Sequence, residues 1–394
     1  MPKRVGFLYE RMKDTDFVRR CIVKAAKGKR RRRGVRQVLE DVEGYTARMV
    51  EIVRNQDFTP RQPTHRTIYD PNCEKWREIS SIPFFPDAIM HQLTVTAMQD
   101  VLMRGMSPWS CASVPGWGGA RVRKRIMQVL QKDPKGTKYA LEADIKHYYP
   151  SIPLEGLLDA LERKIKDKTF LLLVMVEVTC YPGGLGGAME KGLTARDLAR
   201  GKVGIEIGFY LDQWLANFYL ERADHLMERE PGVKYEVRHM DNFTLFGPNK
   251  RKLHRAREAL ERHFEADLGV RMKGNWQVYR TGFTGAAEKR HRLLPPRQRS
   301  LRRPRRVAAV GYRFDHEHVT LRGRNFLRLT RQSRKIQKKQ AAGRNISFHQ
   351  AAGFLSRAGQ LRHCDSYKIQ EKYIQPVDIR QLKTIVRNRN NNRR

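Results

Sequence analysis

The chain has 394 residues, and 79 Lys and Arg against 41 Asp and Glu give it a formal net charge of +38. Such self-repulsion destabilises a compact protein unless a polyanion offsets it, which excludes an ordinary metabolic enzyme. A wholly disordered basic tail is excluded too, because 40% of the residues are hydrophobic and 9% are aromatic. The composition predicts a folded protein of two or three domains that works on nucleic acid, with an acidic membrane surface as the weaker alternative.

The sequence predicts a cytoplasmic protein with no membrane partner. The longest apolar run, 170–176, is far too short for a membrane span, and the first five residues lack an apolar signal core. The five cysteines are widely scattered and none belongs to a CxxC pair: Cys21, Cys73, Cys111, Cys180 and Cys364. We interpret them as free thiols in a reducing compartment, not as a disulfide frame or a zinc site.

The first third of the chain is predicted to be mainly helical. Residues 1–34 show no regular pattern and end in a run of Lys and Arg, so we expect an irregular basic arm that binds nucleic acid. Apolar residues recur at helical spacing over 35–55 and 84–104. A Gly-rich loop at 115–119 then precedes a basic helix. That helix carries Arg121, Arg123 and Lys124.

The middle of the chain predicts a mixed domain of strands and helices. Residues 138–145 alternate like a strand that ends in Asp144. Residues 235–247 indicate a strand, a turn and a strand, with Asp241 in the turn. A Gly-, Lys- and Arg-rich stretch at 181–202 predicts a mobile insertion. Helices are expected at 154–166, 212–229 and 250–266.

The last third predicts a basic loop followed by a helical region. Residues 289–306 hold nine Lys or Arg and three Pro, a composition that cannot pack a core and indicates a loop. Residues 307–321 predict a short hairpin, and 324–386 predict three further helices. The tail at 387–394 is expected to be disordered.

Two aspartates 97 residues apart suggest a reaction. A single Asp at a strand end or in a turn is usually a surface residue, but Asp144 and Asp241 are both expected at the ends of strands in a strongly basic protein. Nucleotidyl transfer uses two Mg²⁺ ions about 3.5–4 Å apart. Mg²⁺ is typically held by one or two protein carboxylates plus substrate phosphates. A basic nucleoprotein or ribosome-associated factor would fit the charge but needs neither aspartate.

Seven segments resemble, in the family's order, the motifs of reverse transcriptases. KYALEADIKHYYPSI, around Asp144, is similar to the first palm motif, and VRHMDNFTLFG, around Asp241, to the third. GIEIGFYLDQWLANFYL lies between them, where the family has its template and nucleotide motif. DLGVRMKGNWQVY resembles the fourth motif, with Lys273, and VAAVGYRFDHEHVTL the fifth, the primer grip. EKWREISSIPFFPDAIMHQL and CASVPGWGGARVRKRI resemble the fingers motifs, so the resemblance covers about residues 65–375.

The resemblance implies a right-hand polymerase of the α+β class. Its fingers would span 35–137, its palm 138–321 with an antiparallel sheet, and its helical thumb 322–386. The arm at 1–34 and the tail at 387–394 would flank these three parts.

The resemblance also assigns roles to individual residues. Mg²⁺, or Mn²⁺ in its place, would be held by Asp144, Ile145 and Asp241. Asn242 and Lys273 would join them in catalysis, with Lys273 protonating the leaving pyrophosphate. The incoming nucleotide would be bound by Lys75, Arg77, Tyr149 and Gln213, of which Tyr149 is the steric gate that selects deoxynucleotides. Template and primer would contact Arg121, Arg123, Lys124, Gly311 and Tyr312.

The middle motif discriminates between branches of the family. Residues 207–213, IGFYLDQ, are more similar to the Ile-Gly-Asn-x-x-Ser-Gln pattern of diversity-generating retroelements than to the Gln-Gly-x-x-x-Ser-Pro pattern of intron enzymes. This implies an RNA-directed DNA polymerase that copies a dedicated template RNA into cDNA from dNTPs, together with a small basic accessory protein. Retron and defence-associated reverse transcriptases remain alternatives.

Four residues in two motifs depart from the family pattern. His239 stands where an aromatic is usual, Asn242 replaces the second Asp, and Phe209 and Asp212 replace Asn and Ser. Losing a carboxylate weakens Mg²⁺ binding and favours Mn²⁺. Asp212 is expected to place a negative charge near the incoming triphosphate. A catalytically weakened RNA-binding protein on the same fold is therefore a further alternative.

Overall fold

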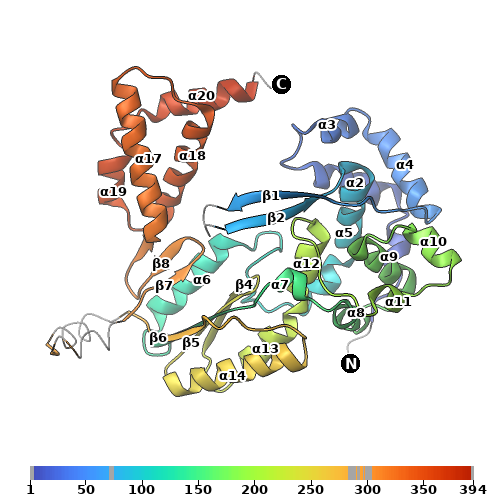
Figure 1. Ribbon diagram of the computed structural model, residues 1–394, viewed down its shortest axis with the longest axis horizontal. Coiled ribbons are helices and arrows are strands. Elements are labelled where there is room, and N and C mark those ends of the chain that lie inside the picture. Colours follow the sequence, from blue (N-terminus) through green and yellow to red (C-terminus); the bar gives the residue numbers. More distant parts are fainter. Residues whose placement is uncertain are drawn as a thin grey trace.

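The structure is a computed structural model that describes residues 4–70, 75–282 and 304–391, with residues 290, 293–295 and 297 between the last two segments. Helices dominate these residues, and the strands form three antiparallel sheets (Figure 1). The mixture of helices with antiparallel sheets confirms the α+β class. The division into fingers, palm and thumb stays a prediction, and most of the expected loop at 289–306, as well as Cys73, lies outside the described residues.

The N-terminal residues belong to a helical body and are not an irregular arm. Helix α2 buries Phe17, Val18 and Ile22, and the Asp14 side chain accepts a hydrogen bond from the Phe17 N–H at 2.6 Å as its N-cap. The prediction for 1–34 was wrong because many Lys and Arg hide the helical spacing of these apolar residues. The body contains α1 (Leu8–Arg11), α2 (Thr15–Ala26), α3 (Arg33–Glu40), α4 (Val42–Arg54), the helical turn η1 (Phe84–Ala88) and α5 (Ile89–Met103).

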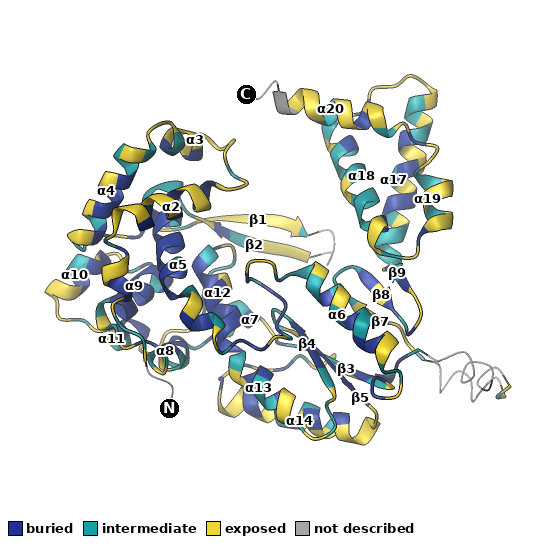
Figure 2. Cartoon of the chain, turned by 180° about the vertical axis from the view of Figure 1, so that it is seen from behind, coloured by how far each residue is buried: buried dark blue, intermediate teal, exposed yellow. Residues whose placement is uncertain are grey.

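A two-stranded hairpin stands out from this body. Strands β1 (Thr64–Asp70) and β2 (Lys75–Ser81) are exposed along most of their length (Figure 2). At the base of the hairpin, the Ser80 N–H donates to the Ile207 carbonyl at 2.8 Å. The hairpin was not predicted, because a strand with two exposed faces shows no alternation of apolar and polar residues.

The predicted mobile insertion at 181–202 is instead packed into the core. It contains two short helices whose Leu185, Ala188 and Leu198 are buried. Thr194 and Asp197 form a capping box at the start of the second helix, so the chain is locally well defined there. The two short helices are α10 (Gly184–Glu190) and α11 (Ala195–Ala199), and the preceding helices are α7 (Tyr148–Ser151), α8 (Leu154–Glu162) and α9 (Lys168–Thr179).

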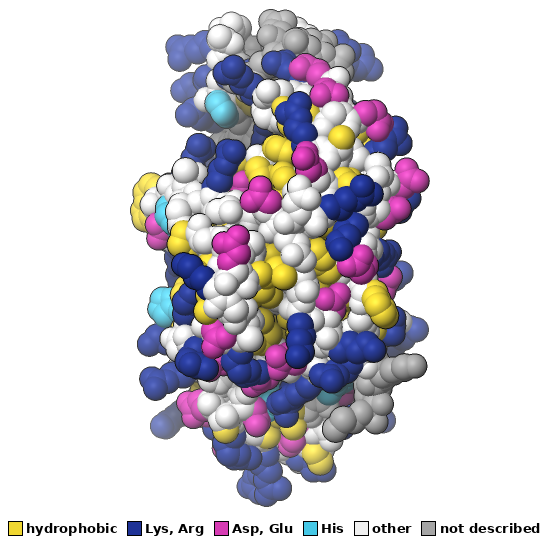
Figure 3. Space-filling model, turned by 90° about the vertical axis from the view of Figure 1, so that its right-hand side faces the viewer, with side chains coloured by type: hydrophobic (Ala, Val, Ile, Leu, Met, Phe, Trp, Pro, Cys, Tyr) yellow, Lys and Arg dark blue, Asp and Glu magenta, His cyan; other side chains and the backbone are white. Residues whose placement is uncertain are grey.

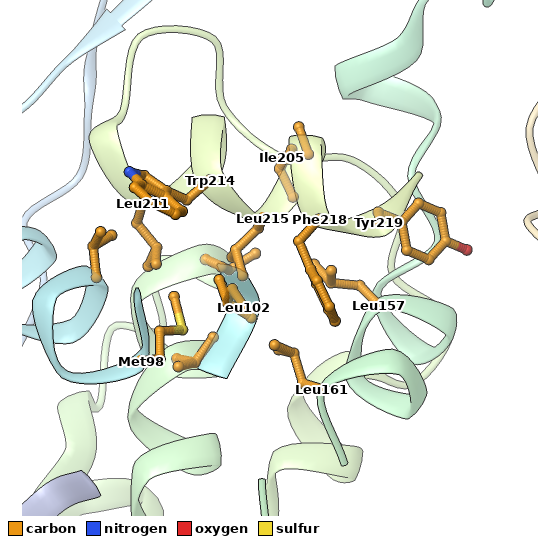
Figure 4. Packing of buried hydrophobic residues seen from close by; sticks show 14 of the residues in the cluster. Met98, Leu102, Leu157, Leu161, Ile205, Leu211, Trp214, Leu215, Phe218 and Tyr219 are labelled. Carbon is orange, nitrogen blue, oxygen red and sulfur yellow. The ribbon is translucent and has the colours of Figure 1, made fainter. Parts of the chain in front are cut away.

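Helix α12 (Tyr210–Tyr219) lies at the centre of the main core. Figure 4 shows Trp214, Leu215 and Phe218 of α12 packed among Leu102 of α5 and Leu161 of α8. Because all five side chains are buried, α12 holds the helical body together. The expected helix at 212–229 is in fact two helices, since α13 (Glu221–Arg229) follows α12 after a break at Leu220.

The central sheet has the strand order β4-β5-β3-β6 and is antiparallel throughout. Helix α14 (Lys250–Ala266), which matches the predicted helix at 250–266, packs beside α13 against this sheet. Helix α6 (Gly119–Lys132) packs on β4 and shares a core cluster with Ala140, whereas Leu141 belongs to the main core. Neighbouring residues of β3 thus face different layers. The strands are β3 (Tyr139–Asp144), β4 (Tyr235–His239), β5 (Asn242–Gly247) and β6 (Gln277–Arg280).

The C-terminal part combines a small sheet with a helical cluster. The expected hairpin at 307–321 has a third strand, giving β7 (Val307–Ala309), β8 (Tyr312–Phe314) and β9 (Val319–Leu321). Four α-helices and one helical turn follow where three helices were expected: α17 (Gly323–Ala341), α18 (Phe348–Gln360), η2 (Leu361–His363), α19 (Tyr367–Tyr373) and α20 (Ile379–Asn391). Helix α20 runs into the predicted disordered tail as far as Asn391. Along the described chain, no helix combines the length and apolar character needed to cross a membrane.

Candidate functional site

The structure brings Asp144 and Asp241 together at one end of the central sheet. Asp144 ends β3 and pairs in register with Asn242, the first residue of β5, while Asp241 precedes it in the β4–β5 turn. Burial, and next a hydrogen bond with Asp144, raise the pKa of Asp241 to about 7. The two carboxylates are therefore close neighbours, as the sequence predicted.

The residues around these carboxylates fit a divalent cation. Oδ1 of Asp144 is buried without a hydrogen-bond partner among the described residues, and the Lys273 ammonium contacts Oδ2. The Asn242 amide donates to Oδ1 of Asp241 at 3.0 Å. Among the described residues no group of three or more His, Cys, Asp or Glu could hold a metal. Two carboxylates, one with an unpartnered oxygen, are still enough for Mg²⁺ when substrate phosphates complete its ligands.

The backbone beside Asp144 is bound by the segment that carries Lys273, which precedes β6. The Lys273 N–H donates to the Asp144 carbonyl at 2.8 Å, and the buried Ile145 pairs with Met272 in an isolated antiparallel bridge. These contacts place Lys273 beside the carboxylates through the main chain as well as through its side chain.

A cleft of about 1320 Å³ opens onto this end of the sheet. Its lining includes Glu142 and Asp144 of β3 together with four arginines, Arg305, Arg306, Arg313 and Arg322. Asp315 and Glu317 line it as well, and Arg306 pairs with Asp315 at 2.9 Å. Arginines close to carboxylates suit a phosphate polymer whose reacting end meets a metal ion.

Tyr149, the expected steric gate, lies on α7 between the carboxylates and α12. Burial raises the pKa of Tyr149, and the nearby carboxyl groups of Asp212 and Asp241 raise it further. The phenol is therefore protonated at neutral pH. This position next to Asp241 is compatible with contact to a nucleotide sugar.

Asp212 does not present a charge to the site, contrary to the expectation from the sequence. Its side chain is fully buried, and Oδ2 accepts the Glu206 N–H at 2.6 Å. Burial raises the pKa of Asp212 to about 8, so the group is mainly protonated at neutral pH. The expected repulsion of a triphosphate is thus removed, because the helix packs this residue inward.

This burial predicts that Asp212→Asn stabilises the protein at neutral and higher pH. Between about pH 4, where the unfolded group titrates, and the native pKa of about 8, the native state holds a proton that the unfolded state has lost. The stability of the wild type therefore falls as pH rises through this window. The variant should lack that decline, so at about 1.4 kcal/mol per pH unit its stability relative to the wild type should rise by roughly 3 to 4 kcal/mol between pH 5 and pH 8.

Urea unfolding of both proteins at pH 5 and pH 8 measures the effect. Asp197→Asn is the control, because hydrogen bonds from Thr194 lower the pKa of the Asp197 carboxyl. That group is ionised in the native and unfolded states at both pH values, so its replacement should leave the pH dependence between pH 5 and pH 8 as in the wild type. Equal pH dependence in wild type and Asp212→Asn would contradict a protonated Asp212.

The expected nucleotide-binding residues of the fingers lie at the surface. Lys75 and Arg77 are exposed on β2, and Arg77 Nε donates to Asp70 Oδ2 at 3.1 Å across the hairpin. Gln213 is exposed on α12. The structure leaves these side chains accessible, and their contact with a nucleotide remains a prediction.

Two of the expected template contacts have structural partners. The Arg121 guanidinium lies 3.8 Å from the Trp117 ring centroid and donates to the Pro108 carbonyl at 2.8 Å. Arg123 lies 5.8 Å from the ring centroid of Tyr312. Lys124 is exposed on the same helix.

The expected primer-grip residues are mainly structural in this state. Tyr312 is buried, and its hydroxyl donates to the Gln360 carbonyl at 3.1 Å, which ties β8 to α18. Gly311 has a φ of 88° in the β7–β8 turn, a conformation that favours glycine. Its carbonyl accepts the Arg322 N–H at 2.9 Å.

Sequence reasoning missed Glu142, which lies two residues before Asp144 on the same face of β3. Its carboxylate accepts the Tyr279 hydroxyl and, at 3.2 Å, the Ala308 N–H, so it joins three strands at the cleft. The signal was present, since alternation along a strand puts residues 142 and 144 on one side.

Comparison with known proteins adds distant structural likenesses only. No protein-family model and no curated protein matches the chain. The telomerase of Candida albicans, in complex with a TWJ fragment of telomeric RNA, is similar with a TM-score of 0.42 at 12% identity, over 73% of this chain and 52% of that one. Apo telomerase of Candida tropicalis has a TM-score of 0.43 at 12% identity, and the match covers 76% of this chain and 52% of that one. A form of it truncated from its C-terminal domain has a TM-score of 0.38 at 12% identity, over 68% of this chain and 55% of that one.

The chain thus spans about half the length of these telomerase chains. TM-scores this low carry no argument about function.

Proposed function

We propose that this protein is an RNA-directed DNA polymerase that copies a dedicated template RNA into cDNA from dNTPs in the cytoplasm. The observation that carries the proposal is the pairing of Asp144 and Asp241 beside a cleft that Asp144 and four arginines line. The motif order in the sequence supports RNA as the template and links the protein to diversity-generating retroelements. A small basic accessory protein belongs to the same proposal.

Asp144 and Asp241 would hold Mg²⁺, or Mn²⁺, with the backbone of Ile145 beside them. The bound ions would activate the primer 3′-hydroxyl and neutralise the leaving pyrophosphate. The unpartnered oxygen of Asp144 supports this assignment. Asn242 offers a carbonyl oxygen in place of a second carboxylate, which lowers the negative charge of the site.

The other residues of the site would position and protonate the substrates. Lys273 neutralises Asp144 in the free protein and would hold a proton at Nζ for the leaving pyrophosphate. Tyr149 would block a ribose 2′-hydroxyl. Lys75 and Arg77 would contact the nucleotide from the exposed fingers hairpin, and Gln213 would contact it from α12.

A basic stripe along α17 supports binding of a nucleic-acid backbone. Five Lys or Arg recur at spacings of three and four residues and so share one face of the helix: Arg324, Arg328, Arg331, Lys335 and Lys338. The opposite face buries Leu329, Ser333 and Ile336. Figure 3 shows Lys and Arg spread widely over another face as well, with Asp and Glu scattered among them, so the positive charge is not confined to the cleft.

Primer extension is the direct test of the proposal. The full chain, with a DNA primer annealed to an RNA template, should incorporate dNTPs in the presence of Mg²⁺ or Mn²⁺ and should discriminate against NTPs. No extension on any primer and template, including cognate RNA with an accessory protein, would overturn it. A short accessory reading frame beside paired variable and template repeats would support the retroelement role, and their absence would favour a defence or orphan role.

Asn242 favours a second candidate, a catalytically weakened RNA-binding protein on the same fold. Asn242→Asp adds a carboxylate beside the Asp144–Asp241 pair. We expect it to lower the Mg²⁺ concentration needed for half-maximal incorporation about tenfold, because each added charge-assisted ligand stabilises the cation. A Mg²⁺ titration of primer extension measures this.

Asp133→Asn, remote from the pair and bound to Lys234, is the matched carboxylate control. If Asn242→Asp and wild type both remain inactive while RNA binding is tight, the second candidate replaces the first.

A further inference from the structure

A fully buried arginine lies directly beneath the turn that carries Asp241. Arg238 is the penultimate residue of β4, and its side chain points away from the cleft, opposite to the cleft-lining Val237 and His239. Both Arg238 and its partner Asp224 are 0% exposed. A buried charge of this kind is retained only when its hydrogen bonds are satisfied.

Arg238 makes hydrogen bonds to three separate segments. Nε and Nη2 donate to the two carboxylate oxygens of Asp224 at 2.5 and 2.6 Å. Nη1 and Nη2 donate to the side-chain and main-chain oxygens of Asn217 at 2.8 and 3.1 Å. Nη1 also donates to the main-chain carbonyl of Met240 at 2.9 Å. The guanidinium thereby links α12 and α13 to the catalytic turn.

The carbonyl of Met240 belongs to the peptide group that leads into Asp241. Met240 has a φ of 56°, a conformation that non-glycine residues adopt rarely and that the surroundings must hold in place. On the other side of the turn, the Ser113 hydroxyl donates to the Met240 sulfur at 3.1 Å. The orientation of this one peptide group sets where the Asp241 carboxylate stands relative to Asp144.

An ion pair alone would not need this geometry. A salt bridge with Asp224 could lie anywhere in the core, and replacement of buried ion pairs by apolar residues is often neutral or stabilising. The bond to the Met240 carbonyl is different, because it connects a rigid two-helix anchor to the main chain of the metal-binding turn.

We infer that Arg238 is a positioning residue, which acts through the Met240 carbonyl to fix Asp241 for metal binding. The inference rests on the proposed function only in assigning a divalent cation to Asp144 and Asp241. Arg238→Lys keeps the charge opposite Asp224 but cannot span Asp224, Asn217 and Met240 at once.

Direct binding of Mn²⁺ to the full chain tests this without relying on activity. Free Mn²⁺ is counted by electron paramagnetic resonance, and urea unfolding is measured on the same samples. Arg238→Lys should raise the dissociation constant for Mn²⁺ at least about tenfold, the usual effect of losing a residue that orients a metal ligand. Ser113→Ala should also raise the dissociation constant for Mn²⁺, by a smaller factor. It provides the test if Arg238→Lys does not fold.

Leu161→Ala is the control matched for stability, since Leu161 is fully buried in α8 and unconnected with the turn. It should lower the urea midpoint without changing the Mn²⁺ dissociation constant. Three results would each overturn the inference. The first is wild-type Mn²⁺ affinity in both Arg238→Lys and Ser113→Ala, and the second is a loss of Mn²⁺ affinity in Leu161→Ala as large as that in Arg238→Lys. The third is the absence of Mn²⁺ binding by the wild type. If Mn²⁺ binding depends on Arg238 but no primer is extended, the proposed polymerase fails while the positioning role stands.

Discussion

Asp144→Asn should abolish nucleotide incorporation and leave RNA binding unchanged. The substitution keeps the shape of the side chain but removes the negative charge that the cation requires, and it leaves Asp241 as the lone carboxylate. Metal ions contribute several kcal/mol to such transition states, and each 1.4 kcal/mol is a factor of ten. We expect a loss of at least about 1000-fold in the rate of primer extension, and a similar loss for Asp241→Asn.

The rate is measured by single-nucleotide primer extension, and RNA affinity by filter binding at fixed salt. Asp159→Asn is a control that removes an exposed carboxylate from α8, where it pairs with Arg196 at 2.6 Å. It should change neither quantity. Incorporation by Asp144→Asn at the wild-type rate would remove Asp144 from the mechanism, and the same result for Asp241→Asn would remove Asp241.

The basic stripe on α17 predicts the largest effect on binding. Replacing Arg331, Lys335 and Lys338 together by Gln removes three exposed charges from one face of the helix. Each lost phosphate contact reduces the salt dependence of binding by about 0.7 for a single strand, so the slope of log affinity against log salt should become shallower by about 2. Affinity for RNA at about 100 mM salt should fall about 10- to 100-fold.

A matched triple substitution tests whether location matters. Arg251, Arg255 and Arg262 are also exposed and share one face of α14, which packs against the central sheet at a distance from the C-terminal helices (Figure 1). Their replacement by Gln removes the same net charge and should affect RNA affinity much less. Equal losses in the two triple variants would show that binding follows net charge alone, without a specific α17 surface.

The strands that carry Asp144 and Asn242 could be predicted because their local pattern agrees with their environment. Residues 138–145 and 235–247 alternate because each strand separates two packed layers, and the pair of aspartates follows from where these strands end. The long helix α14 could be predicted for the same reason, since one face is buried and the other exposed.

Other features depend on contacts that no local pattern contains. The N-terminal helix α2 and the segment at 181–202 look basic or flexible in sequence, yet both bury apolar residues against distant helices. From the sequence Asp212 is expected to be charged, because only its complete burial in the fold raises its pKa enough to keep it protonated. Arg238 looks like an ordinary strand residue, and only the fold shows that it meets Asn217, Asp224 and Met240.

The way the N-terminus is built into the core has a consequence for the order of folding. Val5 pairs with Ile165, and the Tyr9 N–H donates to Asp167 at 2.9 Å, so these contacts join segments 158 or more residues apart. Contacts of such sequence separation close late, because the entropy of a long loop must be overcome first. Helix α2 can pack on α4 and α5 earlier, but the segment from Val5 through α1 stays without its partners at 165–167 and in α9 until residues beyond 167 have left the ribosome. In shorter nascent chains this first segment should be cleaved readily by protease, with protection appearing only once the partner segment has emerged.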